Sequence, residues 1–311
     1  MATKLELITE LSERTAHDVT GNTANWTSFL KTAAWNYKYS FWEQVLIYAQ
    51  RPNATACAPI EVWNQRLGRW VNRGAKGIAL IDDSNSRLTL RYVFNVSDTH
   101  SRSERPINLW TMQGSYAEAV TETLENSFGA LEDKGDIPAA LIDAAKNAVE
   151  DNLQDYVPDL MDFRQDSFLE ELDGLNVEVI FKNLLYNSVA YMLLTRCGYN
   201  AGEYFSPEDF QGATNFNTLD TVTRLGSATS DISEMMLREI SSTVIGIQKS
   251  EKKQIRTVAK NQNVRHNESI KQNDKGDGIH GADLFAGGRL PDTRPDAAGG
   301  RSDIRQVWDV A

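Results

Sequence analysis

Basic and aromatic side chains alternate along residues 31–96, and these residue types suit the binding of a single-stranded nucleic acid. Positive groups follow the phosphates while flat rings stack on bases, and each stack contributes about 1–3 kcal/mol whatever the base. Nine Lys or Arg stand against four Asp or Glu in this stretch, a local charge of +5. The candidate contact residues are Lys38, Tyr39, Trp42, Arg51, Trp63, Arg69, Arg73, Lys76, Arg87, Arg91 and Tyr92.

The rest of the chain has the opposite charge. The net charge of the 311 residues is −11, so the residues outside this basic stretch carry −11 − 5 = −16. An acidic body repels polyanions, and salt screens that repulsion. Any contact with nucleic acid must therefore be made by the basic stretch.

The aromatic residues have a second interpretation, as core. Trp42, Trp63 and Trp70 stand where helices packed on a sheet need large apolar side chains. Arg87 and Arg91 fall on the side of a predicted strand opposite its Leu and Phe residues, so we expect both to be exposed.

Other chemistries find little support in the sequence. The histidines are His17, His100, His266 and His280, and no two have the spacing of metal ligands. The sequence shows no phosphate-binding loop, nucleophile elbow or paired-cysteine motif. Acidic pairs such as Glu150-Asp151 and Glu170-Glu171 are typical of solvated helix faces. We therefore expect no enzymatic activity, no metal and no cofactor.

The setting is predicted to be cytoplasmic. Cys57 and Cys197 lie in apolar surroundings, which is typical of buried, reduced thiols. The N-terminus has no apolar signal-peptide region, and no run reaches the length that a membrane span requires.

Hydrophobic periodicity divides the N-terminal part into helices followed by strands. Helices are predicted over residues 1–20, 25–36 and 41–51, the last beginning at a capping box formed by Ser40 and Glu43 and ending at Pro52. A short helix follows Pro59. Strands are predicted over 69–72, 78–81 and 87–96, with Leu88, Tyr92 and Phe94 on the buried face of an antiparallel meander.

The C-terminal part is predicted to be helical and then disordered. Apolar spacing predicts helices over residues 117–128, 138–156, 159–172, 177–196 and 230–248, the last starting after Thr229. Residues 250–311 lose this spacing and predict a disordered tail.

An ordered series of motifs in the basic stretch resembles a known family. The motifs are a Tyr39-Ser40 opening, LIYAQRPNAT over residues 46–55, Trp63, and GRWVNRGAKGIALI over residues 68–81. This pattern resembles the N-terminal domain of ArdC-type antirestriction proteins, which also occurs in LtrC-like and other large proteins of conjugative mobile elements. The resemblance covers residues 20–97 and implies sequence-independent binding of single-stranded DNA, with restriction or conjugation proteins as partners.

Two features depart from that family. The zinc metallopeptidase-like domain of ArdC proteins has no counterpart here, because the sequence has no H-E-x-x-H motif. The family often has Asn where this chain has Trp42 or Glu43, so DNA contacts at these positions are expected to differ.

The sequence thus predicts an α+β fold, with N-terminal helices packed on a small antiparallel meander, an all-helical region and a disordered tail. The predicted domains are a single-stranded-DNA-binding domain over 1–110, an acidic helical domain over 111–249 and the tail over 250–311. The predicted function is sequence-independent binding of single-stranded DNA during conjugation or antirestriction. The alternative is an acidic interaction module that inhibits or recruits a basic DNA-processing partner such as a restriction enzyme.

Overall fold

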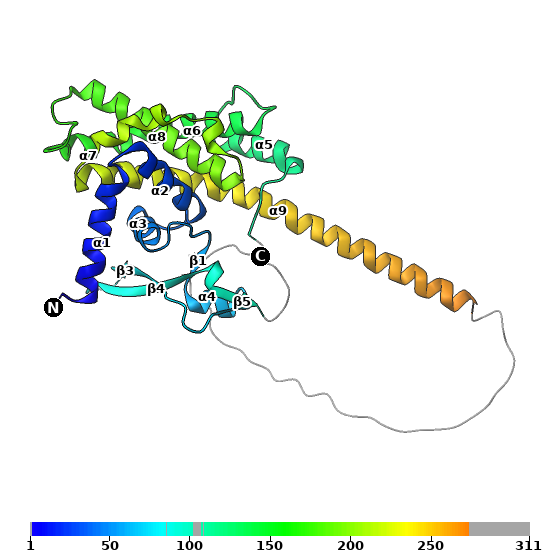
Figure 1. The fold of residues 1–311 in the computed structure, drawn as a ribbon. Helices are drawn as coiled ribbons and strands as arrows, with labels where there is room; N and C mark the ends of the chain where they lie inside the picture. Colours follow the sequence, from blue (N-terminus) through cyan, green and yellow to red (C-terminus); the bar gives the residue numbers. More distant parts are fainter. Residues whose placement is uncertain (1, 85, 102–106, 108, 274–311) are drawn as a thin grey trace. The chain divides into compact units, whose positions relative to one another are not determined.

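The computed structural model of the chain describes residues 2–84, 86–101, 107 and 109–273, with the backbone alone for 255–273. It confirms the predicted α+β class (Figure 1). Residues 1–245 make one compact unit, and residues 246–311 make a second.

Three helices open the chain, each after a residue suited to its N-cap. They are α1 (Lys4–Val19), α2 (Thr23–Trp35) and α3 (Phe41–Gln50). Thr3 and Glu6 form a capping box at α1, and the Asn22 side chain caps α2. The capping box predicted for Ser40 and Glu43 is confirmed at α3. Each cap pairs backbone N–H groups that the first helical turn leaves without a partner.

The strands form two small antiparallel sheets. The elements are β1 (Cys57–Ala58), α4 (Ile60–Gln65), β2 (Arg69–Val71), β3 (Ile78–Asp82), β4 (Thr89–Asn95) and β5 (Thr99–Ser101). One sheet has the order β1-β4-β3, and the other pairs β2 with β5. The predicted antiparallel pairing is confirmed, but β2 is not beside β3 as a meander requires. The backbone N–H of Asn72 donates to the Asp98 carbonyl over 2.8 Å, which holds the end of β2 on the segment before β5.

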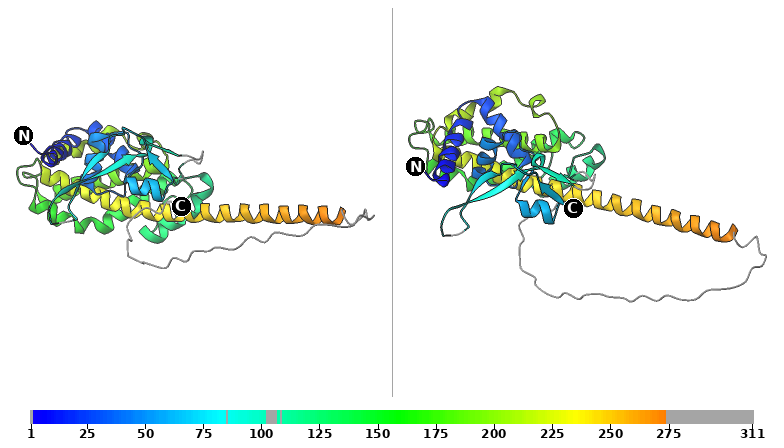
Figure 2. Two further views of the ribbon diagram at one scale, coloured as in Figure 1. Left: turned by 90° about the horizontal axis from the view of Figure 1, so that it is seen from below. Right: turned by 60° about the horizontal axis from the view of Figure 1, so that its bottom comes forward.

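Both faces of β4 are packed: Phe94 on the predicted face packs against Trp63 of α4, but the fully buried residues lie on the opposite face. The alternation is present, but Val93 and Asn95 are buried whereas Leu88 and Tyr92 are 49% and 39% exposed. Asn95 explains the orientation, because its Oδ1 accepts the backbone N–H of Thr55 over 3.0 Å and must therefore point inward. Figure 2 shows the β3–β4 hairpin extending away from the helices.

The remaining elements are helical. The α-helices are α5 (Ala117–Phe128), α6 (Ile137–Asn152), α7 (Val157–Asp162), α8 (Gly174–Cys197) and α9 (Leu219–Asn273). Short 3₁₀ segments are η1 (Val96–Asp98), η2 (Gly114–Tyr116), η3 (Leu153–Asp155), η4 (Ala201–Glu203) and η5 (Pro207–Asn215). The helix predicted over 159–172 is confined to α7, and turns fill residues 163–173.

Helix α9 is longer than predicted at both ends. Thr229, taken as a start signal, lies inside the helix, where its hydroxyl donates to the Leu225 carbonyl over 2.8 Å. The helix also continues to Asn273, into the segment predicted as the tail. Residues 250–273 contain neither Gly nor Pro and are rich in Lys and Gln, which favour helix. Residues 274–311 of the predicted tail lie outside the described residues.

The two segments predicted as separate domains share one core. Trp26 of α2 donates its indole N–H to the Ser188 hydroxyl of α8 over 2.9 Å, and both side chains are buried. Ser230 of α9 donates to Gln44 of α3 over 2.9 Å. Helix α8 and the first half of α9 therefore support the N-terminal helices, which in turn hold the sheet (Figure 1).

Candidate nucleic-acid interface

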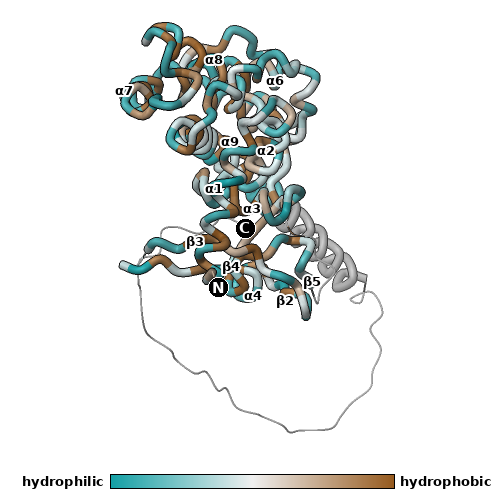
Figure 3. Tube along the Cα trace, turned by 60° about the vertical axis from the view of Figure 1, so that its left-hand side comes forward, coloured by the Kyte–Doolittle hydropathy of each residue, from teal (hydrophilic) through white to brown (hydrophobic). Residues whose placement is uncertain are grey.

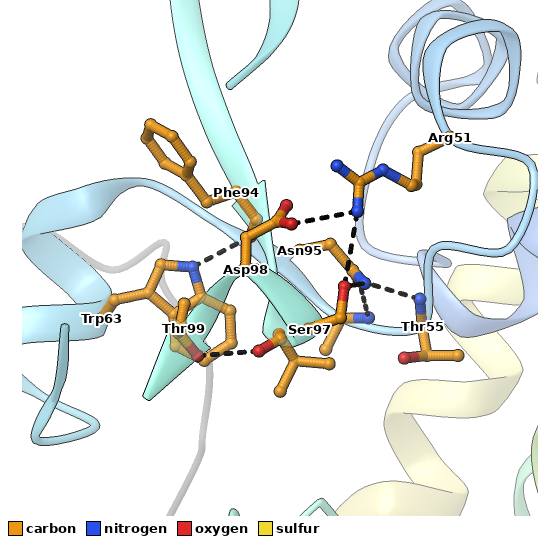
Figure 4. A network of polar contacts seen from close by, with 10 residues as sticks. Arg51, Thr55, Trp63, Phe94, Asn95, Ser97, Asp98 and Thr99 are labelled. Atoms are coloured by element: carbon orange, nitrogen blue, oxygen red, sulfur yellow. Dashed lines mark hydrogen bonds and ion pairs between the residues drawn. The ribbon is translucent and has the colours of Figure 1, made fainter. Parts of the chain in front are cut away.

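Three arginines of the basic stretch are used within the fold. Arg51 pairs with Asp98 over 3.1 Å, Arg91 pairs with Glu43, and Arg69 donates to the hydroxyl and carbonyl of Thr99 over 2.8 Å each. The Arg51–Asp98 pair joins α3 to the turn after β4, where Ser97 and Asn95 extend the network (Figure 4). We therefore assign these three arginines a structural role.

Two of the candidate rings are core residues. Tyr39 is 6% exposed and donates its hydroxyl to the Cys57 carbonyl over 2.8 Å. Burial raises the pKa of Tyr39 well above its ordinary value. Trp63 is 1% exposed and donates its indole N–H to the Phe94 carbonyl over 2.9 Å (Figure 4). Neither ring can stack on a base without unfolding of the sheet, which corrects the expectation for both.

Trp42 lies in a cleft that is unsuitable for phosphates. The cleft has a volume of about 350 Å³ between α1, α3 and the β3–β4 hairpin. Glu13, Glu43 and Asp83 line it together with Trp42 and Leu88. Of these carboxylates Glu43 is paired with Arg91, and the other two leave the cleft negative. Like charge disfavours DNA there, so we exclude Trp42 from the interface.

One face of β3 and β4, on which Ala79 is buried and Phe94 packs against Trp63, keeps an exposed ring. In the β3–β4 register Tyr92 pairs with Ala79 and Leu90 pairs with Ile81, so these four residues share one face. Helix α3 packs against β3 on the other face, where Ile78, Leu80 and Val93 are buried. Figure 3 shows hydrophobic segments of β3 and β4 at this edge of the compact unit.

One cation lies over that ring, and two more are exposed just before β3 and β4. The Lys4 Nζ atom lies 4.8 Å from the centre of the Tyr92 ring. The backbone at Gly77 lies close to Tyr92, because a Cβ atom at Gly77 would lie 3.2 Å from the Cβ of Tyr92. Lys76 precedes Gly77 in the chain and is exposed. Arg87 is exposed beside Leu88. We name the set the open sheet face: Lys4, Lys76, Arg87, Leu90 and Tyr92.

The remaining candidates lie at the margin. Arg73 is exposed in the turn after β2, where Gly74 takes a φ of +85° that favours glycine. Lys38 is half-buried, with its Nζ 5.7 Å from the centre of the Tyr37 ring. Arg73 can reach a strand bound near Lys76, three residues along the chain, while Lys38 is held against the protein.

The sequence did not indicate Lys4 at the interface or His100 in the second sheet. Lys4 belongs to the N-terminal helix, and no local pattern connects it with Tyr92. His100 lies in β5 opposite Trp70, with the two ring centres 6.5 Å apart. His100 Nδ1 lies 2.7 Å from Asn72 Oδ1. The strand at residues 99–101 depends on pairing with β2, which the sequence does not reveal.

The two cysteines lie in the interior of the described part of the chain. Cys57 and Cys197 are both free and buried, as expected, and burial raises the pKa of each thiol to about 12. Among the described residues, His, Cys, Asp and Glu side chains form no group of three that could hold a metal ion. The described helices also include none that is long and apolar enough to cross a membrane.

Comparisons with known proteins find no match. No protein-family model, curated protein or solved structure is similar to this chain at a significant level. We therefore infer function from the geometry of the open sheet face.

Proposed function

We propose that the chain binds single-stranded DNA without sequence preference through the open sheet face. The observation that supports this most directly is the exposed Tyr92 ring with Lys4 over it, while Lys76 and Arg87 are exposed just before β3 and β4. A ring among cations provides both stacking and phosphate contacts, and a base must be unpaired before its face can stack. Duplex DNA is therefore the weaker ligand.

The cellular role we propose is the handling of DNA that enters as a single strand during conjugation, or its protection from restriction. This role depends on the motif resemblance over residues 20–97. The partners consistent with it are restriction or conjugation proteins. Like-charge repulsion from the acidic remainder of the chain disfavours polyanion binding elsewhere on the surface.

The test is fluorescence anisotropy with single- and double-stranded oligonucleotides across a salt series. Four cations, Lys4, Arg73, Lys76 and Arg87, predict a log–log slope of about −3, since each contact with a single-strand phosphate contributes about 0.7. Reversing Lys76 and Arg87 to Glu should abolish measurable binding. Reversing Lys134 and Lys146 to Glu makes the same change in net charge on α6 and the turn before it, away from the sheet, and should have little effect.

The same variants distinguish DNA binding from the alternative function as an acidic interaction module. If the acidic helices act by occupying a basic partner, Lys76→Glu with Arg87→Glu leaves that binding intact. A salt-independent affinity, or equal affinity for single and double strands, contradicts the proposal.

A further inference from the structure

Exposed apolar side chains gather at one end of the compact unit. Of the eleven large apolar side chains that are exposed in the described residues, five lie within residues 163–179 or at residue 219. We name these five the α7–α8 patch: Phe163, Phe168, Leu175, Val179 and Leu219. Phe168 and Leu175 are 65% and 73% exposed, values that are unusual for large apolar side chains in a folded unit.

Contacts bring these residues into one neighbourhood. The Phe163 ring lies 4.3 Å from the guanidinium carbon of Arg224, which follows Leu219 on α9. The backbone N–H of Phe168 donates to Asn217 Oδ1 over 2.9 Å, beside the start of α9. On α8, Leu175 and Val179 are one turn apart and share a face. A Cβ atom at Gly174 would lie 3.8 Å from the Met161 methyl, which puts the start of α8 against α7 (Figure 1).

The segment that carries Phe168 is held in place by internal bonds. Arg164 Nη1 donates to the Leu172 carbonyl over 2.7 Å and closes the turn. Leu169 is completely buried, so the chain is anchored next to the exposed ring. Asp166 has a φ of +61°, a conformation that costs a non-glycine residue free energy. The exposed Phe168 ring is therefore presented by an ordered turn.

Acidic side chains surround the patch. Residues 159–178 contain seven Asp or Glu and one basic residue, Arg164, whose guanidinium is used in the turn. Six of the seven carboxylates are exposed, and Asp159 among them pairs with Arg224 over 3.8 Å. The six exposed carboxylates are Asp159, Asp162, Asp166, Glu170, Glu171 and Asp173. A surface that is apolar at its centre and negative at its rim attracts a ligand with the complementary arrangement.

We infer that the α7–α8 patch docks a partner protein through a basic amphipathic segment, whose apolar side chains cover Phe168 and Leu175 and whose Lys or Arg side chains meet the acidic rim. The negative rim disfavours anionic lipid and nucleic acid at this end of the unit. This docking site is separate from the open sheet face and does not depend on the proposed DNA binding.

The test uses the full chain and a fluorescein-labelled helical peptide with leucine on one face and lysine on the other. Anisotropy should show saturable binding that weakens with salt. Phe168→Ser with Leu175→Ser should weaken binding by about tenfold or more, because both side chains lie at the centre of the contact. Asp162→Asn with Glu171→Gln should reduce both the affinity and its dependence on salt.

Leu7→Ser is the matched control, since Leu7 is 53% exposed on α1 and lies outside the patch. It should bind the peptide as the wild type does, and the Phe168/Leu175 variant should bind single-stranded DNA as the wild type does. Equal peptide affinity in the Phe168/Leu175 variant and the wild type overturns the inference. Two other results also overturn it: dimerisation that this variant abolishes, which makes a second copy the occupant, and patch-dependent binding to phosphatidylserine vesicles.

Discussion

Replacing Gly226 by Ala tests whether the N-terminal helices and α9 share one core. Gly226 lies on α9 where the Phe41 ring of α3 approaches closely. A Cβ atom at residue 226 would lie 2.2 Å from both Cδ2 and Cε2 of Phe41 and 2.5 Å from its Cζ. Ordinary contacts are longer than 3.4 Å, so the ring or the helix must move by more than 1 Å.

The expected cost follows from two opposing effects. Overpacking a close-packed core costs about 1–3 kcal/mol, and the severity of this overlap favours the upper end. Alanine is the better helix former by about 1 kcal/mol. The Phe41 ring cannot turn away freely, because it is 2% exposed and meets Phe29 edge-on with ring centres 5.8 Å apart. We therefore expect a net loss of about 2 kcal/mol in the free energy of unfolding.

Urea denaturation measures this loss as a lower midpoint at an unchanged slope. Gly246→Ala is the matched control, because a Cβ atom there meets nothing within 4 Å. That substitution should stabilise the same helix slightly. Phe41→Leu should be less harmful in the Gly226→Ala background than in the wild type, since the smaller side chain relieves the overlap. If Gly226→Ala is as stable as Gly246→Ala, the packing of α3 on α9 described above is wrong.

Three further predictions concern the interior and one turn. Arg196 is buried, and its guanidinium carbon lies 3.4 Å from the centre of the Trp110 ring. Burial lowers the pKa of Arg196 to about 10. Arg196→Met should therefore cost less stability than Arg196→Lys in urea denaturation, and the reverse order would contradict this. Cys57 and Cys197 should not react with a thiol reagent until the protein unfolds. Folding raises both thiol pKa values from 9.0 to about 12, so the stability that the two protonated thiols contribute should be lost as pH rises from about 9 to 12. Labelling of the native protein at neutral pH would refute the burial of the thiols. Asp166→Gly should stabilise the protein by up to about 1 kcal/mol, measured as a higher urea midpoint, and a lower midpoint would contradict this.

Local signals predicted the elements well. The capping box of Ser40 and Glu43 fixed the start of α3 because both of its bonds join residues three apart. The period of two in residues 87–96 predicted β4. It could not say which face is buried, since that depends on Asn95 and its partners about 40 residues earlier.

The composition of the basic stretch identified candidate cations, but it could not show which of them are used in contacts within the fold. Arg51 pairs with an acid 47 residues away and Arg91 with one 48 residues away, so no local pattern reveals either pair. The same is true of Lys4, which reaches Tyr92 only through the packing of α1. Tertiary contacts therefore decide which members of the basic stretch remain open to a ligand.

The most direct measurement of the central claim compares three single variants in single-stranded DNA binding at fixed salt. Tyr92→Ala should weaken binding by about 5- to 140-fold, the equivalent of one lost stack of about 1–3 kcal/mol. Tyr92→Phe should keep the wild-type affinity because the ring remains, and Trp42→Ala should keep it because Trp42 lies in the acidic cleft. Wild-type affinity in Tyr92→Ala, or a loss confined to Trp42→Ala, would contradict the assignment of the open sheet face as the DNA-binding surface.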